Sequence, residues 1–145
     1  MDQKFILKLS SILGLIGLVD SSYLAFEHYQ GIIPPCTITK GCESVLTSSY
    51  AMLFGIPLVI FGIFFYLLVL SSLALNFYFK KNGLLYFHIL LTLGGFLFSL
   101  RLVYLQLFII RSICLYCMVS AITSTLIFIG AIIFLKLKTN IRNNI

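Results

Sequence analysis

The stretch LFGIPLVIFGIFFYLLVLSSLALNFYF, residues 53–79, contains no charged side chain. About 20 apolar residues are enough to cross ~30 Å of hydrocarbon at ~1.5 Å per residue. Three further apolar runs of similar length occupy residues 5–26, 84–110 and 114–135. The pattern predicts an all-α membrane protein, a bundle of four transmembrane helices with a longer extracytoplasmic loop, residues 27–52, between the first two.

The composition supports membrane insertion. Hydrophobic residues make up 61% of the 145 residues and charged residues 10%, against roughly a quarter in an ordinary globular domain. We therefore expect a single transmembrane domain over residues 1–145. Lys4 and Lys8 precede the apolar stretch ILGLIGLV as in a signal peptide, but no small-residue cleavage site closes a short core and apolar character resumes after Asp20. A retained helix is the better interpretation.

The distribution of cations predicts the orientation. With four spans, both termini lie on one side, and that side receives most of the cations: Lys4, Lys8, Lys80, Lys81, Lys136, Lys138 and Arg142. The positive-inside rule places this side in the cytoplasm, so the protein is expected to be a multi-pass protein of the inner or plasma membrane. Topology and anionic lipid explain the net charge of +6, and no nucleic-acid partner is expected.

The four cysteines form two pairs that this topology places on the outer face. Cys36 and Cys42 lie in the loop, and Cys114 and Cys117 lie in SICLYCMV at the start of the fourth helix. Disulfides persist on the outer side. Residues i and i+3 share a helix face, and a helix N-terminus favours the thiolate, so Cys-x-x-Cys suits redox chemistry. Packing within an apolar helix is the alternative for Cys114 and Cys117.

The loop pair also admits more than one interpretation. Cys36 and Cys42 could form a static disulfide that staples the loop, or the four cysteines could bind zinc. The Cys-x5-Cys spacing is longer than the usual zinc-ligand spacing, and we expect no metal site. Two dithiol pairs on one membrane face instead suggest a relay of thiol–disulfide exchange. A structural or metal-binding membrane protein with a static loop disulfide remains the alternative.

The segment CTITKGCESVLTSSYAMLFGIPLVIFGIFFYL, followed by CLYC, resembles the vitamin K epoxide reductase family in its bacterial form. The resemblance covers about residues 20–120, and it includes the order of the two cysteine pairs, which is reversed in DsbB-type oxidases. It implies a four-helix bundle around a quinone, either ubiquinone or menaquinone. It also implies a thiol:quinone oxidoreductase that supports disulfide bond formation.

The resemblance further implies a role for each site residue. Cys36 would react with a DsbA-like thioredoxin-fold partner, Cys42 would pass electrons to Cys114, and Cys117 would contact the quinone. Ser48 matches the family's loop serine and would be a catalytic and quinone-binding residue. From the residues alone, Ser48 is almost as well explained as the N-cap of the second helix.

Two departures from the family pattern qualify the implied activity. Leu58 and Ala121 stand where vertebrate members have an Asn and a Tyr thought to bind the naphthoquinone, so quinone reduction is expected and epoxide reduction is not. No thioredoxin-like domain follows the fourth helix, so the partner is expected in trans. Asp20 and Arg101 are ionisable residues inside predicted spans. Such residues are either functional or have side chains that pair or reach the interface.

Overall fold

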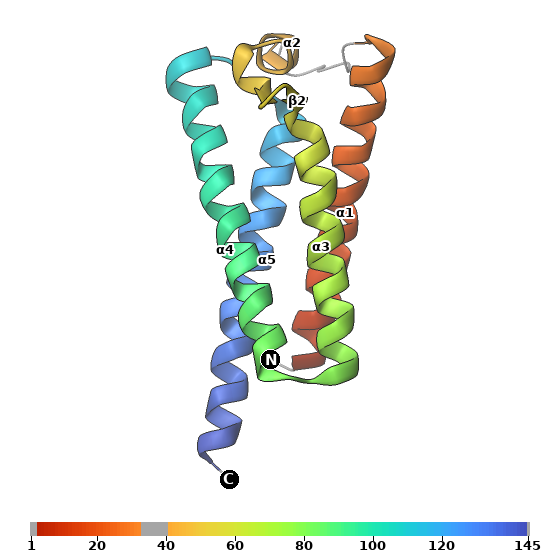
Figure 1. Ribbon diagram of the computed structural model, residues 1–145. Coiled ribbons are helices and arrows are strands. Elements are labelled where there is room, and N and C mark those ends of the chain that lie inside the picture. The colour runs from red at the N-terminus through yellow and green to blue at the C-terminus, as the bar shows by residue number, and fades with distance from the viewer. Residues whose placement is uncertain (1–2, 33–40, 145) are drawn as a thin grey trace.

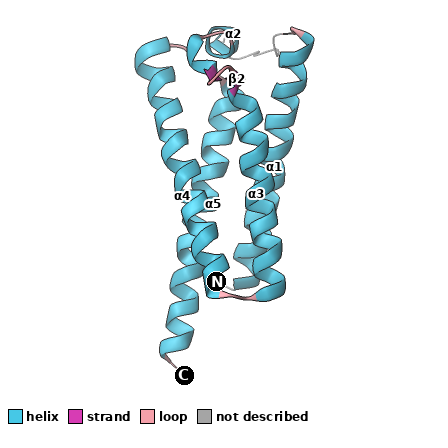
Figure 2. Ribbon diagram, viewed as in Figure 1, coloured by secondary structure: helices cyan, strands magenta, loops and turns pink. Residues whose placement is uncertain are grey.

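The computed structural model of the protein describes residues 3–32 and 41–144 (Figure 1). Cys36 and Lys40 lie outside these residues. The elements are almost entirely helical, as Figure 2 shows. In chain order they are α1 (Gln3–Gln30), α2 (Gly41–Leu46), the 3-10 helix η1 (Ser49–Ala51), β1 (Met52–Leu53), β2 (Ile56–Pro57), α3 (Leu58–Phe79), α4 (Asn82–Tyr104), the π-helix η2 (Leu105–Ile110) and α5 (Leu115–Asn143).

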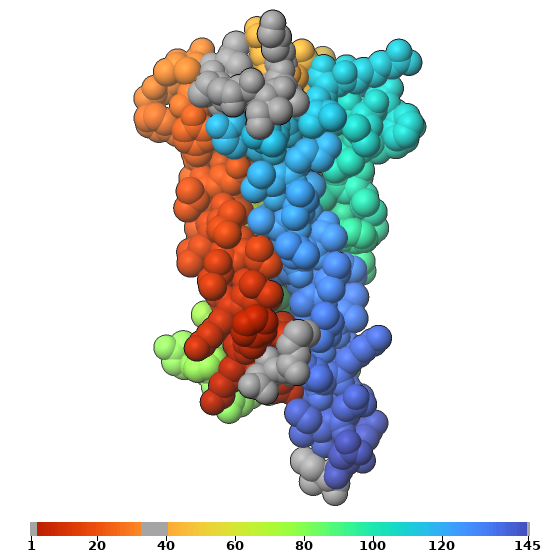
Figure 3. All heavy atoms as spheres, turned by 180° about the vertical axis from the view of Figure 1, so that it is seen from behind, coloured from red at the N-terminus to blue at the C-terminus, as the bar shows by residue number. Residues whose placement is uncertain are grey.

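Four long helices, α1, α3, α4 continued by η2, and α5, are long and apolar enough to cross a membrane. α1 packs against α3 and α5, and α4 packs against α5 and α3. Seen from behind in Figure 3, α1 and α5 lie side by side along the bundle. Both chain ends lie at the end of the bundle opposite α2 and the β1–β2 strands (Figure 1). The predicted four-helix bundle is confirmed, and it is a multi-pass membrane protein.

The outward faces of these helices expose large apolar side chains along their length. Val19, Phe64 and Leu90 are each more than 60% exposed, which is typical of lipid-facing positions and unfavourable in water. The buried core between the helices is formed by Tyr66, Val69, Leu73 and Ile127. We therefore expect lipid to cover the apolar side chains that the bundle leaves exposed.

A glycine allows α1 and α3 to lie close together in this core. The ring of Tyr66 on α3 occupies the space that a side chain at Gly17 on α1 would fill. A larger residue at position 17 would push the two helices apart. The ring of Tyr66 lies in the middle of the bundle, and this close approach leaves it only 1% exposed.

The second predicted span begins at Leu58 rather than at residue 53. Met52–Leu53 pairs with Ile56–Pro57 in a short antiparallel hairpin, whose turn residues Phe54 and Gly55 have φ of 54° and 80°. Two successive residues with positive φ form the turn that a two-residue hairpin favours, and Pro57 then precedes the first helical residue. Because the hairpin is as apolar as the helix, hydropathy does not separate them. The first and last helices also extend further than predicted, to Gln30 and Asn143.

Candidate functional site

The two cysteines of the Cys-x-x-Cys motif lie at the start of α5, one helical turn apart. Cys114 is the N-cap residue of α5, and the backbone N–H of Cys117 donates a hydrogen bond to its Sγ atom at 3.4 Å. Both residues are free thiols, and Cys114 is fully buried. The sulfur takes the place that a Ser or Asp oxygen takes in an ordinary N-cap. The helix dipole therefore favours negative charge at Cys114.

The surroundings of Cys114 lower the pKa of its thiol below the ordinary value. The largest cause is a hydrogen bond from the Cys117 side chain, and backbone N–H groups of Cys117 and Tyr116 add to it. Burial and the charge of Asp20 oppose the shift. The balance favours the thiolate, which is the reactive form in thiol–disulfide exchange. Cys114 is thus the more readily ionised thiol of the pair.

A buried glutamine, which the sequence analysis did not single out, positions Cys114. Gln106 lies in the π-helix η2 and is 2% exposed. The side-chain Oε1 of Gln106 accepts a hydrogen bond from the backbone N–H of Cys114 at 3.0 Å. The backbone carbonyl oxygen of Gln106 accepts one from the backbone N–H of Ser112 at 3.1 Å. Arg111 closes η2 in a left-handed conformation, with φ of 55°. π-Helical turns often mark functional sites, and this one ties the end of the third span to the start of α5.

The other described cysteine, Cys42, is buried against Cys114. Cys42 is disulfide-bonded and 1% exposed, and it forms one buried cluster with Val45 and Cys114. Cys117 packs against this cluster from α5. Cys36 lies outside the described residues, so its predicted pairing with Cys42 stays a prediction. The structure thus brings three of the four predicted cysteines together at one end of the bundle.

Gly41 allows α2 to approach the segment before α5. A Cβ atom at position 41 would lie 2.6 Å from the carbonyl oxygen of Ile113 and 2.7 Å from its backbone nitrogen. Real Cβ atoms do not come so close to backbone atoms, so only glycine fits without a shift of the chain. The residue next to it, Cys42, is therefore held against Cys114 by a backbone-to-backbone contact.

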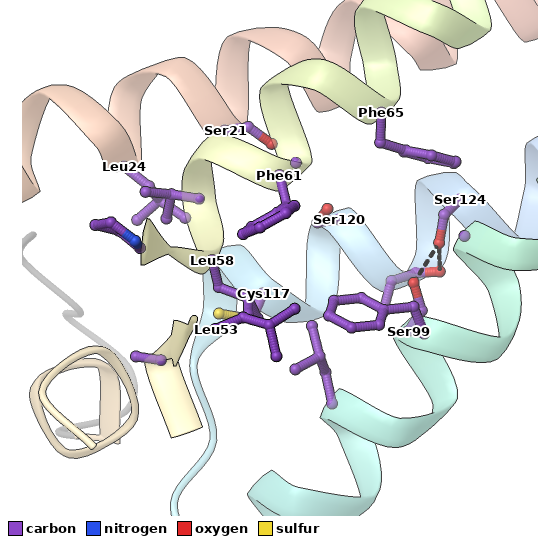
Figure 4. Close-up of a pocket in the computed structure, with 18 of the residues that line it drawn as sticks. Ser21, Leu24, Leu53, Leu58, Phe61, Phe65, Ser99, Cys117, Ser120 and Ser124 are labelled. Atoms are coloured by element: carbon purple, nitrogen blue, oxygen red, sulfur yellow. Dashed lines mark hydrogen bonds between the residues drawn. The ribbon is translucent and has the colours of Figure 1, made fainter. Parts of the chain in front are cut away.

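A cavity of about 530 Å³ lies between the four long helices, next to the thiol cluster. Its wall is mostly apolar, and Figure 4 shows side chains of all four helices converging on it, including Cys117 of α5 beside Leu58 of α3. Ser48, Leu58, Ala121 and Cys117 all line it. A volume between ~300 and ~1,000 Å³ with few polar groups is typical of small-molecule sites. The cavity is therefore suited to an apolar, ring-sized ligand.

The hydroxyl groups in the cavity wall are mostly hydrogen-bonded within the protein. The Tyr66 hydroxyl donates a hydrogen bond to the carbonyl oxygen of Ser120 at 3.0 Å, and it lies 2.9 Å from Ser120 Oγ and 2.8 Å from Thr123 Oγ1. Ser99 and Ser124 face each other across α4 and α5 at 2.7 Å, as the dashed lines of Figure 4 show. These pairs join the helices around the cavity without adding charge to it.

Ser48 lines the cavity, but it does not cap the second long helix. Its Oγ donates a hydrogen bond to the carbonyl oxygen of Val45 at 2.7 Å, and it precedes only the short η1, with no side-chain cap hydrogen bond. Pro57 precedes α3 instead. The N-cap interpretation is therefore wrong, because the hairpin separates Ser48 from the helix.

Residues 8–132 match the model of the vitamin K epoxide reductase family. The chain belongs to the vitamin K epoxide reductase family. Members of this family are quinone-reducing thiol oxidoreductases, and membership implies thiol:quinone oxidoreductase activity. No curated protein matches the chain. Within residues 3–32 and 41–144, no group of three or more His, Cys, Asp or Glu side chains is placed to hold a metal ion.

The cavity has the features that a quinone of this family requires. Its wall is apolar, it holds the thiol of Cys117, and it is roomy enough for a substituted ring. Leu58 and Ala121, the two departures from the vertebrate pattern, both line it, so the wall lacks an amide and a phenol at these points. A quinone would therefore be held here mainly by apolar contact.

Proposed function

We propose that this protein is a membrane thiol:quinone oxidoreductase that reoxidises a DsbA-like thioredoxin-fold protein in trans and passes the electrons to ubiquinone or menaquinone. The observation that carries the proposal is the continuity from the buried Cys42–Cys114 cluster to Cys117 in the cavity wall. This activity would support disulfide bond formation outside the cytoplasm. Both termini would be cytoplasmic, as the lysines predict.

The electrons would enter through the loop pair. A thiolate of the partner attacks Cys36, the Cys36–Cys42 disulfide breaks, and a second partner thiol releases Cys36 as the partner's own disulfide closes. Two electrons and the corresponding protons then reside on the loop pair. The role of Cys36 in this order rests on the family resemblance.

The second exchange would use the contact between Cys42 and Cys114. The Cys42 thiolate attacks Cys114 in an oxidised Cys114–Cys117 pair, which releases Cys117 as the leaving thiolate. The loop disulfide re-forms as Cys36 displaces Cys114. The resulting state, with Cys42 in a disulfide and Cys114 and Cys117 as free thiols, is the state that the structure presents.

The last transfer would take place in the cavity. A bound quinone supplies the two-electron acceptor, and this chain supplies the Cys117 thiol, an apolar wall that excludes water, and the Ser48 oxygen as a polar contact. Cys114, whose lowered pKa favours the thiolate, then closes the disulfide with Cys117. Each turnover returns the Cys114–Cys117 pair to its oxidised form.

Trapping of thiols in intact cells separates this function from a static loop disulfide. Cells are blocked in quinone synthesis, acid-quenched and labelled with an alkylating reagent that adds mass to each free thiol. A relay accumulates reduced cysteines when its acceptor is removed, so additional labelled thiols are expected. A structural or metal-binding protein would show the same labelling with and without quinone, and that result would overturn the proposal.

A further inference from the structure

The cavity wall contains a carboxyl group that the thiol relay does not use. Asp20 of α1 lines the cavity, and its Oδ2 atom is buried without a hydrogen-bond partner. An unpaired ionised carboxylate in apolar surroundings is costly, and buried polar atoms without partners call for an explanation. A proton on the carboxyl, or a ligand in the cavity that accepts its hydrogen bond, would remove this cost.

The other titratable groups of the wall are less suited to give up a proton inside the cavity. The titratable residues among the described part of the wall are Asp20 and His28 from α1, Tyr50 from η1, Tyr66 from α3 and Cys117 from α5, and α4 contributes none. His28 and Tyr50 are exposed at the outer end. The Tyr66 hydroxyl is already engaged with Ser120 and Thr123. Asp20 is thus the one carboxyl group among the described residues of the wall.

Reduction of a quinone requires protons as well as electrons. The Cys114–Cys117 dithiol loses two electrons and two protons when its disulfide forms, and a quinone gains two of each when it becomes a quinol. Because the wall is mostly apolar, few of its groups can donate or accept these protons. A carboxyl group that gives a proton to a ring oxygen and then takes one from a thiol ends the cycle unchanged.

We propose that Asp20 is the proton-transfer residue of the quinone cavity: it stands protonated at rest, donates its proton to a quinone oxygen, and is reprotonated by a thiol of the Cys114–Cys117 pair. One of the two protons follows this route, and the other passes to the second ring oxygen directly from the dithiol. Asp20 and Cys117 line the same cavity, which supports transfer between the carboxyl group and the dithiol. This inference rests on the proposed function.

The chain offers a matched pair of variants for the test. Asp20→Asn removes the proton but keeps the shape. Glu27→Gln makes the same change at a second carboxyl group of α1, which also has one buried oxygen without a hydrogen-bond partner but does not line the cavity. Pre-reduced purified protein is mixed with a soluble short-chain quinone, and single-turnover quinol formation and quinone affinity are measured. Asp20→Asn is expected to slow quinol formation by about 10²-fold or more, with quinone affinity changed less than about tenfold. Glu27→Gln should stay close to the wild-type rate, and Asp20→Glu, which keeps a transferable proton, should recover part of the rate that Asp20→Asn loses.

A second readout is independent of activity. Wild-type protein labelled with ¹³C-aspartate, which marks Asp2 and Asp20, is examined by infrared spectroscopy at neutral pH without quinone. The carbonyl stretch of a protonated aspartic acid is expected, and its absence would overturn the proposal even if Asp20→Asn did not fold. Equal rates for wild type and Asp20→Asn would also overturn it, while leaving the proposed function intact. A wild-type protein that reduces no quinone would instead overturn both the role of Asp20 and the proposed function.

Discussion

The two ends of the bundle are built differently. At the end where α1 begins and α5 ends, which the lysines predict to be the inner end, α3 and α4 are joined through Lys80 and Lys81 alone. The buried side chains of Ser72 and His88 form a hydrogen bond there, with 2.6 Å between Oγ and Nδ1. At the outer end, a short helix, a hairpin and a π-helix interrupt the regular structure, and the thiols lie among them. The inner end only has to hold helices together. The outer end also has to bring the cysteine of α2 to the cysteines at the start of α5, and the irregular segments make this contact possible.

This contrast predicts different consequences of substitution at the two ends. A change at the outer end should alter electron transfer, whereas a matched change at the inner end should alter stability alone. The variants below test this difference, each with its counterpart at the other end where the chain provides one.

The largest effect is expected for Cys117→Ala. Without this thiol, the Cys114–Cys117 disulfide cannot form and no electrons can reach the cavity, so quinone reduction should fall below detection. Ser11→Ala, which removes only a hydrogen bond from Ser11 to Leu7 within the inner half of α1, is the control. Purified Cys117→Ala protein that reduces quinone at the normal rate would remove Cys117 from the site.

Gly41→Ala should have the next largest effect. The added methyl group meets backbone atoms of Ile113, so α2 must shift and carry Cys42 away from Cys114. A misplacement of ~1 Å can slow a reaction by ~10²-fold, and we expect a loss of that order in exchange between the two pairs, measured by rapid acid quenching and thiol labelling.

Gly83→Ala is the inner-end counterpart. No atom lies within 4 Å of a Cβ at position 83, so the change should leave exchange unaffected and stabilise α4 by up to about 1 kcal/mol. Equal exchange rates in Gly41→Ala and wild type would show that the tight packing of α2 is not needed for transfer.

A smaller effect is expected for Gln106→Ala. The buried N–H of Cys114 loses its acceptor, which should lower the free energy of unfolding by about 1–3 kcal/mol and slow quinone reduction several-fold. Asn76→Ala is the inner-end match, because the Asn76 side chain donates to the carbonyl oxygens of Ser72 and Leu84. It should cost similar stability without slowing the reaction. If both variants slowed quinone reduction equally, Gln106 would have no special role at Cys114.

The difference between the ends also explains what could be predicted from the sequence. Long apolar runs reveal regular helices, so the four spans and the helical start at Cys114 followed from hydropathy and spacing. The irregular outer end did not, because the hairpin at Met52–Pro57 is as apolar as α3, although Gly55 and Pro57 marked a turn. The alternative interpretation of Ser48, as the N-cap of the second span, is wrong because the hairpin separates Ser48 from α3.

Tertiary packing set the remaining parts of the site. Gln106 is one of many residues in an apolar run, and only the π-helical turn directs its amide to the Cys114 backbone. Gly41 has no special sequence pattern, and its role depends on the approach of Ile113 from a distant segment. The free carboxyl oxygen of Asp20 is likewise visible only once α1 and the cavity are in place.

The transfer between Cys42 and Cys114 is tested most directly by trapping it. In Cys117→Ala protein, Cys114 can attack Cys42 of the loop disulfide and release Cys36, but without Cys117 the resulting Cys42–Cys114 bond cannot be exchanged for a Cys114–Cys117 disulfide. Purified Cys117→Ala protein is quenched with acid, alkylated, digested without reduction and mapped by mass spectrometry. A Cys42–Cys114 disulfide with a free, alkylated Cys36 is the predicted product. A Cys36–Cys114 disulfide with alkylated Cys42 would contradict the assigned order, and the absence of any bond to Cys114 would contradict the relay itself.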